Sequence, residues 1–297
     1  MDRATVFIAC SSIIMTVASA APVPDVGWSA YGGDASGTRY SPAAQITPAN
    51  VDQLEVAWTF RTGELGQGVK DWSRSAFEAT PILYDDTLYL TTSSTDVVAV
   101  NAVTGQLRWR HDSRSRNDLH YSDGVSRGVS LWVDPSSPPD AVCHARILAP
   151  TLDGRLLALD AATGKPCVEF GAHGAVNLLQ DVRSQFKEGD EWRDYLVTSP
   201  PAILGDKVIV GSAIGDNRAV LEELGIVRAY DARRGRLAWS WDPIPRDASN
   251  PVYKEWSPAS IASASAANAR SIVGRSPRIS CTAAHTSFAN RTSGAAG

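Results

Sequence analysis

The sequence has few sulfur-containing and imidazole side chains, with two Met, four Cys and five His in 297 residues. The Cys and His residues are also scattered, which excludes a module that binds several zinc ions. Lys and Arg number 28 against 32 Asp and Glu, so the chain lacks the excess of positive charge typical of nucleic-acid binding. With 43% hydrophobic and 20% charged residues, the composition is globular. It excludes collagen-like, coiled-coil and polytopic membrane proteins.

The last 41 residues lack Asp, Glu and Trp. They contain 20 Ala or Ser and four Arg, whereas all nine Trp of the chain lie between Trp28 and Trp256. Such a biased composition is poorly suited to building a packed core. We therefore expect residues 258–297 to form an aberrant, disordered tail, of the kind that a shifted reading frame or a mis-assembled gene end produces.

The N-terminus carries one apolar stretch, which is too short to span a membrane comfortably. Arg3 precedes the apolar residues 6–17, and the small residues Ala-Ser-Ala follow at positions 18–20. This order predicts a secretory signal peptide over residues 1–20. We therefore expect an exported, periplasmic protein, either free or associated with the membrane.

Export would allow a disulfide bond between cysteines of the mature chain. Cys143 and Cys167 flank one predicted hairpin, in which residues 146–151 turn into residues 155–160. Spacing in the sequence does not establish whether the two Cα atoms come within bonding distance. A disulfide bond and two free buried thiols therefore both remain open.

The pattern A-x-(D/N)-A-x-x-G occurs three times, at residues 99–105, 158–164 and 229–235. The Asp or Asn side chain can accept hydrogen bonds from the backbone of a turn, and the Gly four residues later can adopt the positive φ that closes it. Trp109 and Trp239 lie four residues after the Gly in the first and third copies. The repeat predicts an all-β fold of similar units with Trp packed between neighbours.

Strand-like runs joined by turn residues precede each copy of the repeat. Four antiparallel strands per copy describe the blades of a β-propeller, and a β-sandwich, the alternative, does not need this repeat. We predict three blades, at about residues 76–112, 126–172 and 197–241, preceded by a Trp-containing strand at residues 54–60. No fourth blade is recognised after residue 241, so apolar blade faces are expected to be exposed.

Several segments match one known family in order. The first runs from Trp28-Ser-Ala-Tyr-Gly32 to Trp58, and it is followed by Phe77-Glu78-Ala79-Thr80-Pro81, Ser126-Arg127-Gly128-Val129-Ser130 and residues 153–160, 198–201 and 211–217. Through these motifs the chain resembles the N-terminal part of the pyrroloquinoline-quinone (PQQ) dependent dehydrogenases. The similarity covers about residues 27–257 and is greatest to the glucose, polyol and quinate dehydrogenase branch.

The resemblance implies a fold, a cofactor and a reaction. The fold is a partial PQQ-type β-propeller at residues 27–257, from a ring that has eight blades in the full family. PQQ would lie in the central funnel with Ca²⁺ or Mg²⁺. A hydroxyl group of a sugar or polyol would be oxidised, and the electrons would pass to a membrane quinone.

The resemblance also implies cofactor-binding residues. Glu78 and Arg127 match positions that bind PQQ, and Arg suits a tricarboxylate because its planar guanidinium is always charged. Thr198 and Ser212 match hydroxyl groups that contact the cofactor.

A metal site and a missing catalytic base complete what the resemblance implies. Asp216 and Asn217 match a metal-binding pair, with oxygen ligands suited to Ca²⁺ or Mg²⁺. The family's catalytic Asp, and the Lys and Trp that line PQQ, belong to later blades that have no match in this chain. We therefore assign no catalytic residue and expect a truncated dehydrogenase without turnover of its own.

Two other function classes can be compared with this prediction. A non-catalytic PQQ-repeat propeller could serve as a scaffold in envelope protein assembly, but it would have no use for Glu78 and Arg127. Residues 124–128 match the G-x-S-x-G motif of serine hydrolases. That motif needs a strand before it and a helix after it, whereas a polar loop and a strand are predicted here, which argues against a hydrolase.

Overall fold

The computed structural model describes residues 27–34, 36–64, 75–115, 120–121, 124–180, 182, 192–193, 195–214, 224–243, 249 and 251–257. The predicted signal peptide at residues 1–20 and the predicted tail at residues 258–297 lie outside these ranges and stay predictions. No helix within the described ranges is long and apolar enough to cross a membrane.

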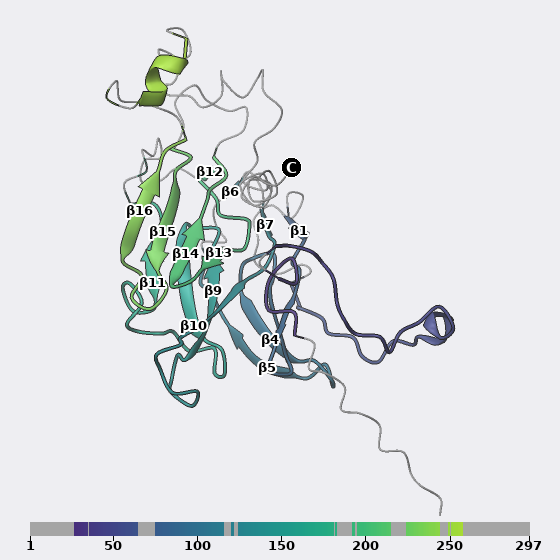
Figure 1. Cartoon of the computed structure of the whole chain (residues 1–297). Helices are drawn as coiled ribbons and strands as arrows, with labels where there is room; N and C mark the ends of the chain where they lie inside the picture. Colours follow the sequence, from purple (N-terminus) through teal and green to yellow (C-terminus); the bar gives the residue numbers. More distant parts are fainter. Residues whose placement is uncertain are drawn as a thin grey trace, which may run out of the picture.

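Three four-stranded antiparallel sheets make up most of the described structure (Figure 1). The first contains β2 (Ile82–Tyr84), β3 (Thr87–Thr91), β4 (Val97–Asn101) and β5 (Leu107–His111). The second contains β8 (Ser130–Val133), β9 (Ala145–Pro150), β10 (Arg155–Asp160) and β11 (Ala175–Asn177). The third contains β13 (Ala202–Leu204), β14 (Lys207–Val210), β15 (Val227–Asp231) and β16 (Leu237–Trp241). In every sheet the strands follow one another in sequence order, which confirms the predicted blades.

The hydrophobic core lies between the sheets. One cluster of buried side chains joins the first sheet to the second and contains Ile82, Val97, Ile147 and Leu159. Another joins the second sheet to the third. Each sheet is thus stabilised mainly by apolar side chains that it buries against its neighbours. The second sheet ends with β11, slightly beyond the predicted blade end at residue 172.

The three repeat turns have the predicted geometry. The Oδ1 atom of Asp231 accepts hydrogen bonds from the backbone N–H groups of Arg233 and Arg234 at 3.1 and 2.7 Å. Asn101 and Asp160 accept equivalent bonds in the first and second turns. The closing Gly has a φ of +70°, +69° or +66° in the three copies. Glycine adopts this left-handed conformation without the Cβ clash that other residues incur.

Trp side chains pack on the first two of these turns, as the sequence predicted. Trp109 in the first sheet donates a hydrogen bond from Nε1 to the carbonyl of Ala161 in the second turn, at 3.0 Å. A Cβ atom built on Gly164 would lie 2.5 Å from the Trp109 ring. Trp58 packs equivalently on the first turn and donates to the carbonyl of Ala102 at 3.2 Å.

The predicted strand at residues 54–60 is wrong, because the structure has no strand there. Trp58 nevertheless packs on the first repeat turn as Trp109 packs on the second. Trp109 lies in β5, the last strand of the first sheet. A strand exists only when its backbone pairs with another strand, and no described strand pairs with residues 54–60. Figure 1 shows this N-terminal segment, with η1 (Val51–Gln53), extending away from the sheets.

Charged and aromatic side chains join the second sheet to the third, where the repeat has Val168 in place of Trp. Val168 itself is exposed. The buried Arg146 instead donates hydrogen bonds across the interface to the carbonyl groups of Ala232 and Arg233. The guanidinium groups of Arg146 and Arg233 both lie over the Trp132 ring, at 5.4 and 5.6 Å from its centroid. These cation–π contacts and hydrogen bonds take the place of the Trp side chain that packs between the first and second sheets.

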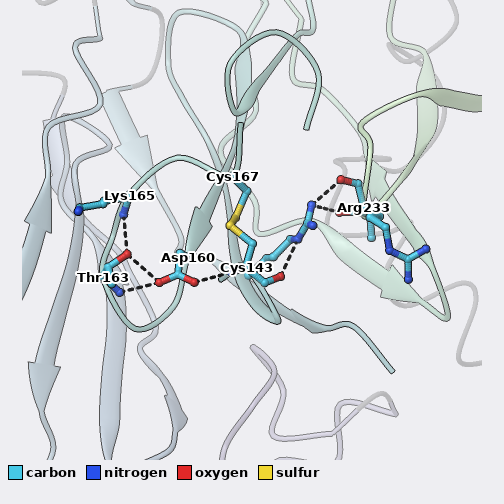
Figure 2. The surroundings of a disulfide bond; sticks show 8 residues. Cys143, Asp160, Thr163, Lys165, Cys167 and Arg233 are labelled. Carbon is cyan, nitrogen blue, oxygen red and sulfur yellow. Dashed lines mark hydrogen bonds between the residues drawn. A yellow bond between two sulfur atoms is a disulfide. The ribbon is translucent and has the colours of Figure 1, made fainter. Parts of the chain in front are cut away.

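A disulfide bond joins Cys143 and Cys167 (Figure 2), and their Cα atoms are 5.8 Å apart. This answers the question that the sequence left open. Beside the bond, the Oδ2 atom of Asp160 accepts a hydrogen bond from the backbone N–H of Cys143 at 2.7 Å. The bond closes a loop with a sequence separation of 24 residues. Closing a loop of this length stabilises the folded chain by about 3 kcal/mol.

Acid is expected to weaken the ion pair between Asp134 and Arg233. Hydrogen bonds from Arg233 hold the pKa of the buried Asp134 carboxyl well below its ordinary value of 3.8. In the unfolded chain this pKa is about 3.9. The pair therefore contributes stability above about pH 4 that is lost as the pH falls towards the folded pKa. Asp134→Asn should lower the free energy of unfolding by about 2 kcal/mol at neutral pH, and less at pH 3, as measured by urea unfolding.

Asp206→Asn is the matched control for this experiment. Asp206 also pairs with a cation, the Lys207 ammonium at 2.5 Å, but its side chain is exposed to solvent. Exposed pairs contribute little to stability, so this variant should unfold like the wild type at either pH. A loss in Asp134→Asn that is the same at pH 7 and pH 3 would contradict the argument.

The outer face of the third sheet is exposed, as the sequence predicted. Trp239, which corresponds to Trp109 in the repeat, is 42% exposed, and Trp241 is 57% exposed. Trp109 is partly buried because the second repeat turn covers it. No turn among the described residues covers Trp239 in that way.

Candidate functional site

Three of the residues predicted to bind the cofactor occupy equivalent places in the three sheets. Glu78 lies four residues before the start of β2, Arg127 three residues before β8, and Thr198 four residues before β13. These are the first strands of the three sheets. The repeat therefore brings one residue from each sheet to the same end of the structure.

Two short parallel strands set Glu78 and Arg127 side by side. β1 (Ser75–Phe77) pairs with β7 (Gly124–Ser126), and Phe77 is opposite Ser126 in the register. Glu78 directly follows β1, and Arg127 directly follows β7. Figure 1 shows β1 and β7 near the other short parallel pair, β6 (His120–Tyr121) and β12 (Trp192–Arg193), at the upper end of the sheets in this view.

Backbone hydrogen bonds join the three segments that lead into β2, β8 and β13. The N–H of Arg127 donates to the carbonyl of Thr198 at 2.8 Å, and the N–H of Thr80 donates to the carbonyl of Arg127 at 3.1 Å. Gly128 allows this approach, since it has a φ of +126° and a Cβ atom there would lie 2.8 Å from the Thr80 oxygen. The main chain thus fixes the spacing of the three sheets at the site.

The side chains of the three residues are also bonded to one another. Arg127 makes an ion pair with Glu78, with 2.9 Å between Nη2 and Oε2. Its Nη1 donates a hydrogen bond to the Thr198 hydroxyl at 2.8 Å. Arg127 and Glu78 are 32% and 41% exposed in their side chains, so a ligand can reach them. Thr198 is buried.

Ser212, the fourth predicted residue, is buried on a neighbouring segment after β14. The next residue, Ala213, forms an isolated bridge with Leu196, with hydrogen bonds of 2.9 and 2.7 Å. Leu196 lies two residues before Thr198. The fold therefore brings the segment of Ser212 beside the segment of Thr198.

The predicted metal pair, Asp216 and Asn217, lies outside the described residues. Within the described ranges, no group of three or more His, Cys, Asp or Glu side chains is arranged to hold a metal ion. A Ca²⁺ or Mg²⁺ site stays a prediction from the resemblance.

The chemistry of these side chains suits an anionic ligand with several oxygen atoms. A guanidinium supplies planar, permanently charged donors, and the hydroxyl groups of Thr198 and Ser212 can donate or accept. PQQ, with three carboxylates and a quinone, fits this set of groups. Sequence reasoning missed the pairing of β1 with β7. Glu78, Arg127 and Thr198 all lie three or four residues before the first strand of a sheet, and this similar spacing was a signal that could have shown their convergence.

Comparisons with known proteins agree with this picture. The family model described as "Glucose/ethanol/alcohol dehydrogenase, beta-propeller domain" (PQQ) matches residues 28–273. The chain is 36% identical over 255 residues to the glycerol dehydrogenase large subunit of Gluconobacter oxydans, covering 83% of this chain and 33% of that protein. It is 36% identical over 230 residues to the quinoprotein glucose dehydrogenase of Escherichia coli, covering 76% of this chain and 28% of that protein.

A solved structure supports the same fold. The quinohemoprotein alcohol dehydrogenase of Comamonas testosteroni superposes with a TM-score of 0.57 at 29% sequence identity. The match covers 76% of this chain and 28% of that protein. The chain therefore spans about a third or less of the length of these relatives.

Proposed function

Because the chain belongs to the family of PQQ-dependent (quinoprotein) dehydrogenases, we propose that its three sheets form the part of a propeller that binds PQQ, in a protein that oxidises a hydroxyl group of a sugar or polyol. Members of the family are named dehydrogenases of glycerol and glucose, compounds that carry CH–OH groups. One observation carries the proposal for this chain. The residues that precede three successive sheets, Glu78, Arg127 and Thr198, meet in a single bonded group.

Each residue of this group has a distinct task in holding the cofactor. Arg127 would bind a carboxylate of PQQ, since its guanidinium offers more than one N–H in a plane. Glu78 holds that guanidinium in orientation through the 2.9 Å ion pair. Thr198 limits its rotation from the other side through the 2.8 Å hydrogen bond. Bound PQQ would supply the redox chemistry, as a quinone that accepts two electrons from the alcohol.

The remaining parts of the proposal rest on the resemblance. Asp216 and Asn217 would bind Ca²⁺ or Mg²⁺, and a membrane quinone would receive the electrons. An exported, periplasmic location would follow from the signal peptide at residues 1–20. We assign no catalytic base to this chain and expect it to bind PQQ without turnover. The scaffold alternative is less favoured because it does not account for the Arg127 group.

Titration of the purified full chain with PQQ tests the proposal. Binding is followed by Trp fluorescence and equilibrium dialysis, with and without Ca²⁺ or Mg²⁺, and dye reduction is then measured with glucose, glycerol and quinate. We expect saturable PQQ binding and no dye reduction. Absence of PQQ binding under all metal conditions would refute the cofactor site. Dye reduction by this chain alone would refute the expected lack of turnover.

A further inference from the structure

Five hydroxyl side chains occupy the corner between β3 and β4, at residues 91–95 (Thr-Thr-Ser-Ser-Thr), which we call the hydroxyl corner. Two of them bond to the strands that precede the cofactor-site residues. Ser126, the last residue of β7, donates a hydrogen bond from Oγ to Thr91 Oγ1 at 2.8 Å. Ser93 donates from Oγ to the carbonyl of Ala76 in β1 at 3.2 Å. Both short strands are therefore fastened to the same corner.

A buried carboxylate, that of Glu64, also bonds to the hydroxyl corner. Glu64 Oε2 accepts a hydrogen bond from the backbone N–H of Ser93 at 2.8 Å, and Oε1 accepts one from the N–H of Ser94 at 3.2 Å. The Ser94 hydroxyl also bonds to Oε1. A buried carboxylate is costly unless it is hydrogen-bonded. The three bonds therefore fix the corner and Glu64 to each other.

We propose that the hydroxyl corner positions the Glu78–Arg127 pair for cofactor binding, with Thr91, Ser93 and Ser126 as positioning residues. This inference rests on the proposed function and names residues that serve the same site without touching the cofactor. Ser126 directly precedes Arg127, so the bond to Thr91 fixes the point from which the Arg127 side chain departs. The bond from Ser93 to the β1 backbone does the same two residues before Glu78.

The contact between Thr91 and Ser126 has the properties that a positioning role requires. Both side chains are completely or almost completely buried. Apolar side chains of similar size would fill the same space, but a hydrogen bond also fixes direction. The two short strands share only three residue pairs. A small displacement between them would separate the Glu78 carboxylate from the Arg127 guanidinium, so their relative position needs external support.

Thr91→Val and Thr87→Val form a matched pair that tests the inference. Both residues are buried Thr in β3, and Thr87 donates to the carbonyl of Asp85 at 2.9 Å at the opposite end of the strand. Each change removes one hydroxyl and keeps the shape. Thr91→Val should raise the Kd for PQQ by roughly 3- to 10-fold, the equivalent of one hydrogen bond. Thr87→Val should leave the Kd unchanged although it lowers the melting temperature to a similar degree.

A double-mutant cycle with Glu78→Gln separates positioning from general destabilisation. If the corner acts through the Glu78–Arg127 pair, Thr91→Val has a much smaller effect on the Kd once Glu78 is already replaced. An equal effect in both backgrounds, an equal effect of Thr87→Val, or no effect of Thr91→Val would each overturn the inference.

A measurement without PQQ keeps the two proposals distinguishable. The guanidinium N–H resonances of Arg127, assigned with Arg127→Lys, should shift in Thr91→Val and remain unchanged in Thr87→Val. If the wild type does not bind PQQ, the cofactor proposal fails, and these resonances still decide whether the hydroxyl corner positions Arg127. Unchanged resonances in Thr91→Val would refute the positioning role.

Discussion

Arg127→Gln should raise the Kd for PQQ by roughly 100-fold or more, because it removes the two charge-assisted hydrogen bonds that the guanidinium would donate to a PQQ carboxylate. Gln keeps similar length and polarity but has neither the charge nor the planar fork of the guanidinium. It also releases Glu78, whose carboxylate would then face an anionic ligand without its 2.9 Å partner. Arg127→Lys should have a smaller effect, roughly 10-fold, because the charge remains and the fork is lost. Fluorescence titration with PQQ measures both changes.

Arg155→Gln is the control for this prediction. Arg155 pairs with Asp153 at 2.8 Å, and its side chain is 30% exposed, close to the values for Arg127. The change therefore removes a comparable ion pair and the same formal charge. The Kd for PQQ should stay near that of the wild type. If Arg155→Gln weakened binding as much as Arg127→Gln, the effect would come from net charge, and the site assigned to Arg127 would be wrong.

Gly164→Ala should lower the free energy of unfolding by about 3–4 kcal/mol, through a left-handed backbone and a steric overlap together. Gly164 has a φ of +69°, and a Cβ atom there would lie 2.5 Å from the Trp109 ring. Trp109 cannot easily withdraw, because its Nε1 is bonded to the carbonyl of Ala161 at 3.0 Å. The change therefore forces the first and second sheets apart. Urea unfolding followed by circular dichroism gives the free energy.

Gly205→Ala separates the two causes. Gly205 also has a positive φ, +58°, but an added Cβ atom would meet nothing within 4 Å. This variant should lose only the conformational part, about 1–2 kcal/mol. The difference between the two variants then measures the overlap with Trp109. An equal loss of unfolding free energy in both variants would mean that the packing of Trp109 on Gly164 does not hold the two sheets together.

The repeat made the blades and turns predictable. In each copy the side chain of Asn or Asp and a Gly four residues later act on the same few residues, so the local sequence determines the turn. The spacing of Trp109 from the first turn indicated the contact with the next sheet in the same way. The exposed face at Trp239 followed from the same repeat.

Contacts between distant segments were harder to predict. Residues 54–60 have the sequence of a strand, yet strand formation depends on a partner that the described structure does not provide. The parallel pairing of β1 with β7 has no local turn to indicate it, because parallel strands are joined by long connections. The hydrogen bonds from Arg146 to the third sheet depend on the position of the turn at residues 231–235 in the folded chain. Spacing could not choose between disulfide and thiols at Cys143 and Cys167 for the same reason.

A ligand bound at Glu78, Arg127 and Thr198 would also affect the cooperativity of folding. In a linear array of sheets, stability is approximately a sum of the units and their nearest-neighbour contacts. Among the described residues the first and third sheets each have one neighbouring sheet, but Trp58 packs against the first. Trp239 and Trp241 of the third are exposed, so local opening is expected to begin there. A ligand held by residues of all three sheets would close that end, and its binding energy would stabilise the array as a whole. Cofactor binding would then couple the unfolding of all three sheets, each of which otherwise depends on contacts with its nearest neighbours.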